Sequence, residues 1–456
     1  MKIDIETLSK YSKPGPRYTS YPTAPVFNDE FTVQDYHEII GARDRSHIPL
    51  SLYFHLPFCT SVCFFCACNV IYTKNAARTA PYLDLLREEM RMLASELDPA
   101  RVVKQLHWGG GTPSFLTPEE MAALWKDITT YFTIAPDAEI SVELDPRSTT
   151  AEHVEVLAKC GFNRASLGVQ DLDPRVQEAV NRIQPLEMSR ELAAQLRAKN
   201  FHGVNVDLIY GLPEQTLGSF EHTLDEILEL KPDRISLFHF AYLPHLKKHQ
   251  KRIDEGALPS TETKLEIFKM ATERFLEAGY RYIGMDHFAL PDDEMSVAQE
   301  NRRLHRNFQG YTICRDCDLL GIGVTSIGEA GGAFIQNQKD MKAYEEAISS
   351  GSLAVYRGHK RTRDDEIRRR VILELICNFE LHFSEVEAEF DINFQEYFAE
   401  ELPGLQPFME DELLIQEGDV IRVTEAGRYV IRNICMVFDA YLKTLETRGQ
   451  KFSKTV

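Results

Sequence analysis

The sequence predicts an α/β fold built on an incomplete (β/α)6 parallel barrel. From residue 50 onward, short β-branched or alternating apolar runs alternate with segments of helical periodicity. Such alternation is typical of a parallel sheet whose strands are joined by right-handed helical crossovers. The pattern leaves the closure of the sheet open. Six units are two short of a complete barrel, however, and an incomplete barrel would leave a lateral opening for a large substrate.

Composition limits the class of protein. Of the 456 residues, 43% are hydrophobic and 27% are charged, which is ordinary for a globular protein. The formal net charge of -19 argues against binding to nucleic acid, which depends on clustered Lys and Arg. The chain has neither a signal peptide pattern nor a run of about 18 apolar residues. We therefore expect a cytoplasmic protein without a membrane span.

Three regions are predicted along the chain. Residues 1–48 form an N-terminal arm, which we expect to close over the substrate as a lid; the alternative is a strap that only stabilises the fold. Residues 49–350 form the barrel and an extension. The barrel strands are predicted at 51–56, 102–108, 139–144, 164–170, 204–210 and 234–240. A helix is predicted at 81–97, because it opens with Pro81 and has one apolar face.

The segments after the sixth strand are less regular. A seventh strand is predicted at 281–289, followed by irregular sequence. Residues 360–456 are predicted to form a small, mostly helical domain with a hairpin wing. In it, residues 361–379 and 428–442 have helical periodicity, and residues 413–425 are typical of a hairpin that turns at Gly418 and Asp419.

Four cysteines lie within the ten residues CTSVCFFCAC (59–68). In a cytosolic protein, clustered cysteines bind metal or act in catalysis more often than they form disulfides. Structural zinc usually takes two short ligand pairs, and here the second pair is absent; buried free thiols are the other alternative. Cys59, Cys63 and Cys66, spaced C-x3-C-x2-C, fit an iron–sulfur cluster better. Such a cluster would keep one iron open to a small molecule with an amino and a carboxylate group.

The remaining cysteines need a separate interpretation. Cys68 is a candidate fourth ligand, but in extended backbone its side chain would lie about 7 Å from that of Cys66. We therefore expect Cys68 to stay outside the ligand set. Cys314 and Cys317 form a further C-x2-C pair. This pair is either a redox or second metal site, or it consists of two incidental thiols. The absence of two further ligands nearby favours incidental thiols.

The segment CTSVCFFC resembles the signature of the radical S-adenosylmethionine (SAM) enzymes, and GGGTP (109–113) fits the same family. Three glycines after a strand would let backbone N–H groups approach a ligand closely. Further segments resemble the oxygen-independent coproporphyrinogen III oxidases from about residue 10 to the C-terminus. They include YTSYPTA (18–24), GFNRASLGVQ (161–170), HRNFQGYT (305–312) and IRNICMVFDAYL (431–442).

This resemblance implies a barrel of radical SAM type and an oxidoreductase that converts two propionates of coproporphyrinogen III to vinyls. The product would be protoporphyrinogen IX, made without O2 for haem (porphyrin) biosynthesis. The cofactors would be one [4Fe-4S] cluster on Cys59, Cys63 and Cys66, and SAM. A monomer reduced by a flavodoxin or ferredoxin is also implied. The alternative is a non-enzymatic haem-binding chaperone of the same superfamily, but Cys68, the Tyr-rich N-terminal segment and the C-terminal domain favour the enzyme.

The resemblance also implies the residues of the SAM site. Gly110, Gly111 and Thr112 are expected at the methionine amine and carboxylate of SAM. The other implied contacts are Tyr53, Phe65, Glu143, Gln170, Arg182, Asp207, Ala241 and Ile327.

A porphyrinogen with four carboxylates requires cationic partners in this acidic chain. Desolvating an unpaired carboxylate costs several kcal/mol, and the bidentate guanidinium of Arg is the better match. The candidates are Arg17 in the arm and Arg302, Arg303 and Arg306 in NRRLHRNFQGYT. The alternative for each is a solvated basic turn balanced by neighbouring acids.

Overall fold

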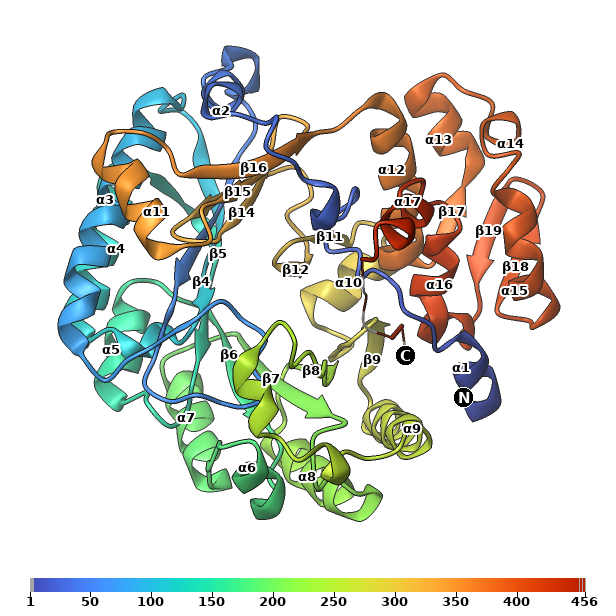
Figure 1. The fold of residues 1–456 in the computed structure, drawn as a ribbon, viewed down its shortest axis with the longest axis horizontal. Helices are drawn as coiled ribbons and strands as arrows, with labels where there is room; N and C mark the ends of the chain where they lie inside the picture. Colours follow the sequence, from blue (N-terminus) through green and yellow to red (C-terminus); the bar gives the residue numbers. More distant parts are fainter. Residues whose placement is uncertain (1–3, 451, 453, 456) are drawn as a thin grey trace.

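A twelve-stranded sheet forms the centre of the computed structural model, which describes residues 4–450, 452, 454 and 455 (Figure 1). In spatial order its strands are β16 (Val355–Lys360), β15 (Ala333–Asn337), β14 (Ile327–Ala330), β13 (Asp318–Ile322), β1 (Leu50–Leu56), β4 (Val102–Gly110), β5 (Thr133–Leu144), β6 (Arg164–Gln170), β7 (Gly203–Tyr210), β8 (Arg234–His239), β10 (His287–Ala289) and β9 (Arg281–Gly284). Pairing is parallel from β13 to β8 and antiparallel on both flanks. Within the described residues β16 and β9 remain edges, so the barrel is incomplete, as predicted.

The six predicted β/α units are confirmed. Their helices form an outer arc around the strands in Figure 1. These helices are α3 (Thr79–Glu96), α4 (Pro118–Tyr131), α5 (Ala151–Lys159), α6 (Pro174–Ala179), α7 (Leu186–Ala198), α8 (Leu217–Leu230) and α9 (Thr261–Glu277). Local sequence sets their ends: α4, for example, begins with a capping box between Thr117 and Glu120, and has Pro118 in its first turn. Among the described helices, none is long and apolar enough to cross a bilayer.

The predicted seventh strand at 281–289 is wrong. These residues form two short antiparallel strands, β9 and β10, and β10 pairs with β8. The chain reverses at Met285, whose φ is +51°. The parallel partner on the other side of β1 is instead β13, which the sequence analysis did not predict.

Several shorter elements complete the barrel extension. They are β2 (Phe58–Cys59), β3 (Ile71–Tyr72), α10 (Glu294–Glu300), the hairpin of β11 (His305–Asn307) and β12 (Gly310–Thr312), and α11 (Met341–Ser349). The last of these helices packs against α3. The strands β2 and β3 frame the loop that carries the cysteines.

The C-terminal region is mostly helical and carries the predicted hairpin. Its elements are α12 (Arg363–Asn378), β17 (Glu380–His382), α13 (Phe383–Phe390), α14 (Phe394–Tyr397), α15 (Gln406–Glu410), β18 (Leu414–Glu417), β19 (Val420–Val423), α16 (Ile431–Met436) and α17 (Leu442–Thr447). The hairpin of β18 and β19 turns at Gly418, whose φ of +62° suits glycine.

The N-terminal arm is part of the core. It contains α1 (Ile5–Tyr11) and α2 (Val33–Ile40), and it runs from the C-terminal region across to the barrel edge (Figure 1). Tyr18 and Tyr21 are each 2% exposed, and the Tyr18 hydroxyl donates to Asp439 (3.0 Å). The Arg432 guanidinium donates to the Pro16 carbonyl (2.9 Å). This packing favours a strap over a lid that swings open.

Candidate functional site

A cavity of about 740 Å³ lies at the carboxyl ends of the parallel strands, where barrel active sites are built. Most of the predicted site residues line it: Cys59, Cys63, Phe65, Cys66, Gly110, Gly111, Thr112, Glu143, Gln170, Arg182 and Asp207. The fold thus brings together residues that are far apart in the sequence.

Three predicted residues are not part of this lining. Tyr53 lies on β1 behind the cavity, where its hydroxyl donates to His55 Nδ1 (3.0 Å) and its ring stacks on that of His107. The Ala241 carbonyl accepts from Gln250 Nε2 (3.0 Å). Ile327 lies on β14, beyond β13. Their contact with SAM stays a prediction.

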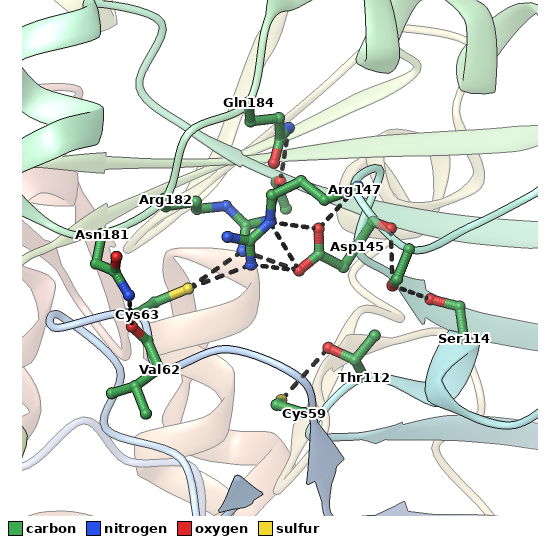
Figure 2. Close-up of polar contacts among 12 residues, drawn as sticks. Cys59, Val62, Cys63, Thr112, Ser114, Asp145, Arg147, Asn181, Arg182 and Gln184 are labelled. Carbon is green, nitrogen blue, oxygen red and sulfur yellow. Dashed lines mark hydrogen bonds and ion pairs between the residues drawn. The ribbon is translucent and has the colours of Figure 1, made fainter. Parts of the chain in front are cut away.

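The cysteine loop is fixed at several backbone groups. The Cys59 carbonyl accepts the N–H of Thr73 (2.9 Å), and the Cys63 carbonyl accepts that of Cys66 (3.1 Å). The Asn181 side chain donates to the Val62 carbonyl (2.6 Å) (Figure 2). The loop therefore presents its thiols to the cavity from a defined backbone.

Two arginines face the Cys63 thiol. Arg147 Nη2 lies 3.4 Å from Cys63 Sγ and Arg182 Nη1 lies 3.6 Å from it, and Figure 2 shows both guanidinium groups pointing at the sulfur. Both also pair with Asp145, at 2.6 and 3.2 Å. Although burial disfavours its charge, these guanidinium groups hold the pKa of Asp145 below its ordinary value. N–H groups aimed at a sulfur stabilise a thiolate, the form that a metal centre requires.

The backbone at Cys68 differs from the extended backbone that we expected. The backbone bends at Cys68 instead of staying extended, and Cys66 and Cys68 both line the cavity. A hydrogen bond from the Cys68 thiol lowers the pKa of Cys66 to about 6, against the effect of burial. The extended backbone on which the expected separation rested is therefore absent, and the exclusion of Cys68 from the ligand set stays a prediction.

The donor set fits a cluster better than a single ion. In the part of the chain that the structure describes, no three His, Cys, Asp or Glu side chains gather closely enough to hold one metal ion. A cuboidal cluster is wider than one ion, so its thiolate ligands need not touch each other. Cys59, Cys63 and Cys66 share one cavity wall and thus fit a [4Fe-4S] group.

The glycine loop supplies shape rather than N–H donors. A Cβ at Gly110, whose φ is +110°, would lie 2.7 Å from the His55 ring, and one at Gly111 would lie 2.6 Å from the Pro57 backbone. The N–H of Gly111 donates to Leu56 (2.8 Å), and those of Gly110 and Thr112 are also bonded within the protein. These N–H groups are therefore hydrogen-bonded within the protein, and the glycines allow close packing on β1, while contact of this loop with SAM stays a prediction.

Two carboxylates in the cavity titrate differently. Glu143 is partly exposed, and its contacts with His107 (3.3 Å) and the Gly110 N–H (3.1 Å) hold its pKa below the ordinary value. For Asp207, burial and then the nearby Glu143 charge raise the pKa to about 6. The Asp207 carboxylate accepts from Ser166 (2.9 Å) and Asn205 (2.7 Å). Both groups could accept hydrogen bonds from an ammonium or a ribose hydroxyl.

Asp207→Asn is expected to stabilise the ligand-free protein at neutral pH and to weaken SAM binding. Because the folded-state pKa of about 6 exceeds the ordinary 3.8, the Asp207 charge lowers stability as pH rises from 3.8 to about 6, and the loss persists above that. We expect a gain of about 1 kcal/mol near neutral pH and none near pH 4. Thermal unfolding at both pH values checks this. A variant that is equally destabilised at both would contradict it.

The candidate substrate arginines differ sharply from one another. Arg306 is 5% exposed, stacks on the Tyr311 ring (4.7 Å), and has no described hydrogen-bond partner at Nε or Nη1. Arg17 pairs with Asp286 (2.7 Å). Arg303 is exposed.

Arg302 does not face the cavity. It pairs with Glu385 (2.8 Å) of the C-terminal region, so its assignment to the substrate is wrong. Tyr311 and His287, beside Arg306, do line the cavity. Arg306 is therefore the best placed of the four candidates.

Sequence reasoning missed several residues around the cysteines. In the loop after β5, the ion pairs that Asp145 makes with Arg147 and Arg182 were not predicted. His249 was also missed; its Nε2 donates to the Cys66 carbonyl (2.7 Å). No periodic pattern signals such contacts, because they join separate loops.

Cys314 and Cys317 lie outside this site. They flank the turn at residues 315–316 and line a separate cavity of about 350 Å³. A hydrogen bond from the Cys317 thiol lowers the pKa of Cys314. Neither residue lines the cavity that contains Cys59, Cys63, Cys66 and Cys68.

Comparison with known proteins adds independent evidence. Residues 53–227 match the family described as the Radical SAM superfamily, and residues 362–430 match the HemN C-terminal domain. The chain is 45% identical over 459 residues to the oxygen-independent coproporphyrinogen III oxidase of Pseudomonas aeruginosa, covering 100% of this chain and 99% of that relative. The chain is also 45% identical over 453 residues to the Escherichia coli oxidase, and this match covers 99% of this chain and 98% of that relative. A solved structure of coproporphyrinogen III oxidase from Escherichia coli, described as a radical SAM enzyme, superposes on this chain with a TM-score of 0.93 at 45% identity. The superposition covers 97% of this chain and 100% of that chain.

Proposed function

Since the chain belongs to the family of oxygen-independent coproporphyrinogen III oxidases, we infer that it decarboxylates two propionates of coproporphyrinogen III oxidatively to vinyls. The product is protoporphyrinogen IX, for haem synthesis without O2. The observation that carries this inference is the convergence of three spaced cysteines, the glycine loop and two carboxylates, Glu143 and Asp207, on one cavity. The haem-binding chaperone is not favoured, because the similarity to the oxidases extends through the arm and the C-terminal region.

The cavity would hold both cofactors. Cys59, Cys63 and Cys66 would bind a [4Fe-4S] cluster, and SAM would occupy the adjoining space. When bound, the two cofactors would supply one-electron radical chemistry. Arg147 and Arg182, whose nitrogen atoms lie 3.4 and 3.6 Å from the Cys63 sulfur, would offset the charge of the bound cluster.

The SAM contacts in this chain are proposed from their position. Glu143 and Asp207 accept from the ammonium or ribose hydroxyl groups of SAM. The remaining contacts that we propose are Tyr53, Phe65, Gly110, Gly111, Thr112, Gln170, Arg182, Ala241 and Ile327.

The substrate side of the site needs a cation. Arg306 lies beside the cavity and its Nε and Nη1 have no described hydrogen-bond partner, so it can pair with a propionate. Phe238, Met295 and Tyr311 contribute largely apolar surface to the cavity lining. This surface excludes water, which strengthens the ion pair and protects a radical.

Anaerobic incubation with SAM, dithionite and coproporphyrinogen III tests the function. The expected product has lost two molecules of CO2, as mass spectrometry of the extracted porphyrins would show. Stoichiometric haem binding by the loaded protein without turnover would instead support the chaperone. Absence of any decarboxylated product from cluster-loaded protein would overturn the proposal.

The cellular location, the oligomeric state, the electron donor and the domain boundaries are further proposals. We propose a cytoplasmic monomer that receives electrons from a flavodoxin or ferredoxin. We also propose the arm as residues 1–48, the barrel with its extension as 49–350 and the C-terminal domain as 360–456. Packing of the arm on the C-terminal region and the separate match of residues 362–430 support these boundaries.

A further inference from the structure

A strongly basic segment lies between β8 and α9. It reads LPHLKKHQKR (243–252) and includes Lys247, Lys248, Lys251 and Arg252. The chain as a whole carries a net charge of -19, so this segment differs from the rest of the surface in sign. In the site described so far, only His249 and Gln250 of this segment take part, and its cations have no role there.

This segment lies directly on the cysteine loop. Lys247 Nζ donates to the Cys68 carbonyl (2.9 Å), and Gln250 Nε2 donates to the Phe65 carbonyl (3.0 Å). The Arg252 guanidinium lies 5.3 Å from the centre of the Phe64 ring. The segment therefore covers the outer side of the loop that carries the predicted cluster ligands.

The positive charges on it are not neutralised. Among the described residues, none of the four cations forms an ion pair with a carboxylate, and Lys248, Lys251 and Arg252 are exposed. Leu246, beside them, is 67% exposed, the highest value of any large hydrophobic residue in the described chain. An exposed apolar side chain rimmed by charge is typical of a surface that binds a partner transiently.

We propose that this basic patch, defined as Leu246, Lys247, Lys248, Lys251 and Arg252, docks an acidic one-electron carrier protein. The inference rests on the proposed function, which needs an external electron. The acidic surface elsewhere repels such a carrier, while the patch attracts it to the side of the molecule nearest the cysteine loop. One electron passes from the reduced carrier to the bound cluster, the carrier is oxidised by one electron, and no covalent bond changes.

The double variant Lys248→Glu/Lys251→Glu tests the patch, because neither side chain contacts the cavity. Reduced flavodoxin is the probe. We expect its Kd, measured by calorimetric titration, and its KM in turnover to rise by roughly tenfold or more. Turnover driven by dithionite should not change. Higher salt should weaken flavodoxin binding to the wild-type protein more than to the variant.

A matched control makes the same change in net charge elsewhere. Lys126 on α4 and Lys443 on α17 are both exposed, so Lys126→Glu/Lys443→Glu should leave flavodoxin binding unchanged. Equal losses of binding in both double variants would overturn the patch. A different result would also overturn the patch. The wild-type protein would bind a short DNA duplex, the patch variant would not, and both would bind flavodoxin equally well.

The two proposals fail in different ways. If the wild-type protein makes no product with dithionite, the proposed function fails, whatever the patch does. If dithionite supports turnover but flavodoxin binds the patch variant as well as it binds the wild type, only the docking proposal fails.

Discussion

Replacing Cys59, Cys63 or Cys66 by serine is expected to remove the iron–sulfur cluster and all activity. A serine hydroxyl stays protonated at neutral pH, so it cannot replace a thiolate ligand, and two thiolates would remain for a cluster that needs three from the loop. Anaerobically reconstituted wild-type protein should hold about four iron and four sulfide ions per chain. Iron and sulfide analysis, with the visible absorption spectrum, measures the loss.

Two further cysteine variants serve as controls. Cys160→Ser changes a buried thiol that lies outside the cavity, so it should keep its iron. Cys68→Ser should also keep the cluster. Its turnover should be reduced, because Cys68 lines the cavity. Full iron content in any of the three ligand variants would contradict the assignment. Iron loss in Cys68→Ser would make Cys68 a ligand.

Arg306→Ala is expected to raise the KM for coproporphyrinogen III by about 10- to 100-fold, since a hydrogen-bonded charge pair contributes about 1.5–3 kcal/mol. SAM cleavage without substrate should be unchanged. Because Arg306 is buried without a partner at Nε and Nη1, its loss should not lower the Tm of the ligand-free protein. Steady-state kinetics and thermal unfolding check both parts.

The neighbouring Arg303→Ala provides the matched control, because Arg303 is exposed and should leave the substrate KM unchanged. A lower SAM affinity or iron content in Arg306→Ala, with substrate affinity preserved, would assign Arg306 to the cofactor site or to the fold. The basic pocket would then have to lie elsewhere.

Local patterns predicted the fold where strands are followed by amphipathic helices. The six parallel strands were found because each contains a short β-branched or alternating apolar run between segments of helical periodicity. Strand β13 was missed because its partner, β1, lies far away in the sequence. The strands β9 and β10 were predicted as one strand. Their turn, at Met285 and Asp286, lacks the Gly or Asn pairs that mark hairpins.

Residue spacing could predict the site only where the functional residues lie in one loop. Spacing alone indicated Cys59, Cys63 and Cys66. By contrast, Arg302 and Arg306 lie in one basic segment, and sequence cannot separate them. The short hairpin of β11 and β12 buries Arg306, while Arg302, before it, reaches the C-terminal region.

The parallel pairing of β1 with β13 has a consequence for synthesis of the chain. The cysteine loop follows β1 directly, whereas residues 243–252, which cover it, and β13, which completes the sheet beside it, are translated much later. The emerging chain therefore exposes an unpaired apolar strand edge next to reactive thiols for much of translation. An iron–sulfur donor can reach the cysteines in this interval. When translation outpaces the supply of iron and sulfide, we expect inclusion bodies rather than soluble apoprotein.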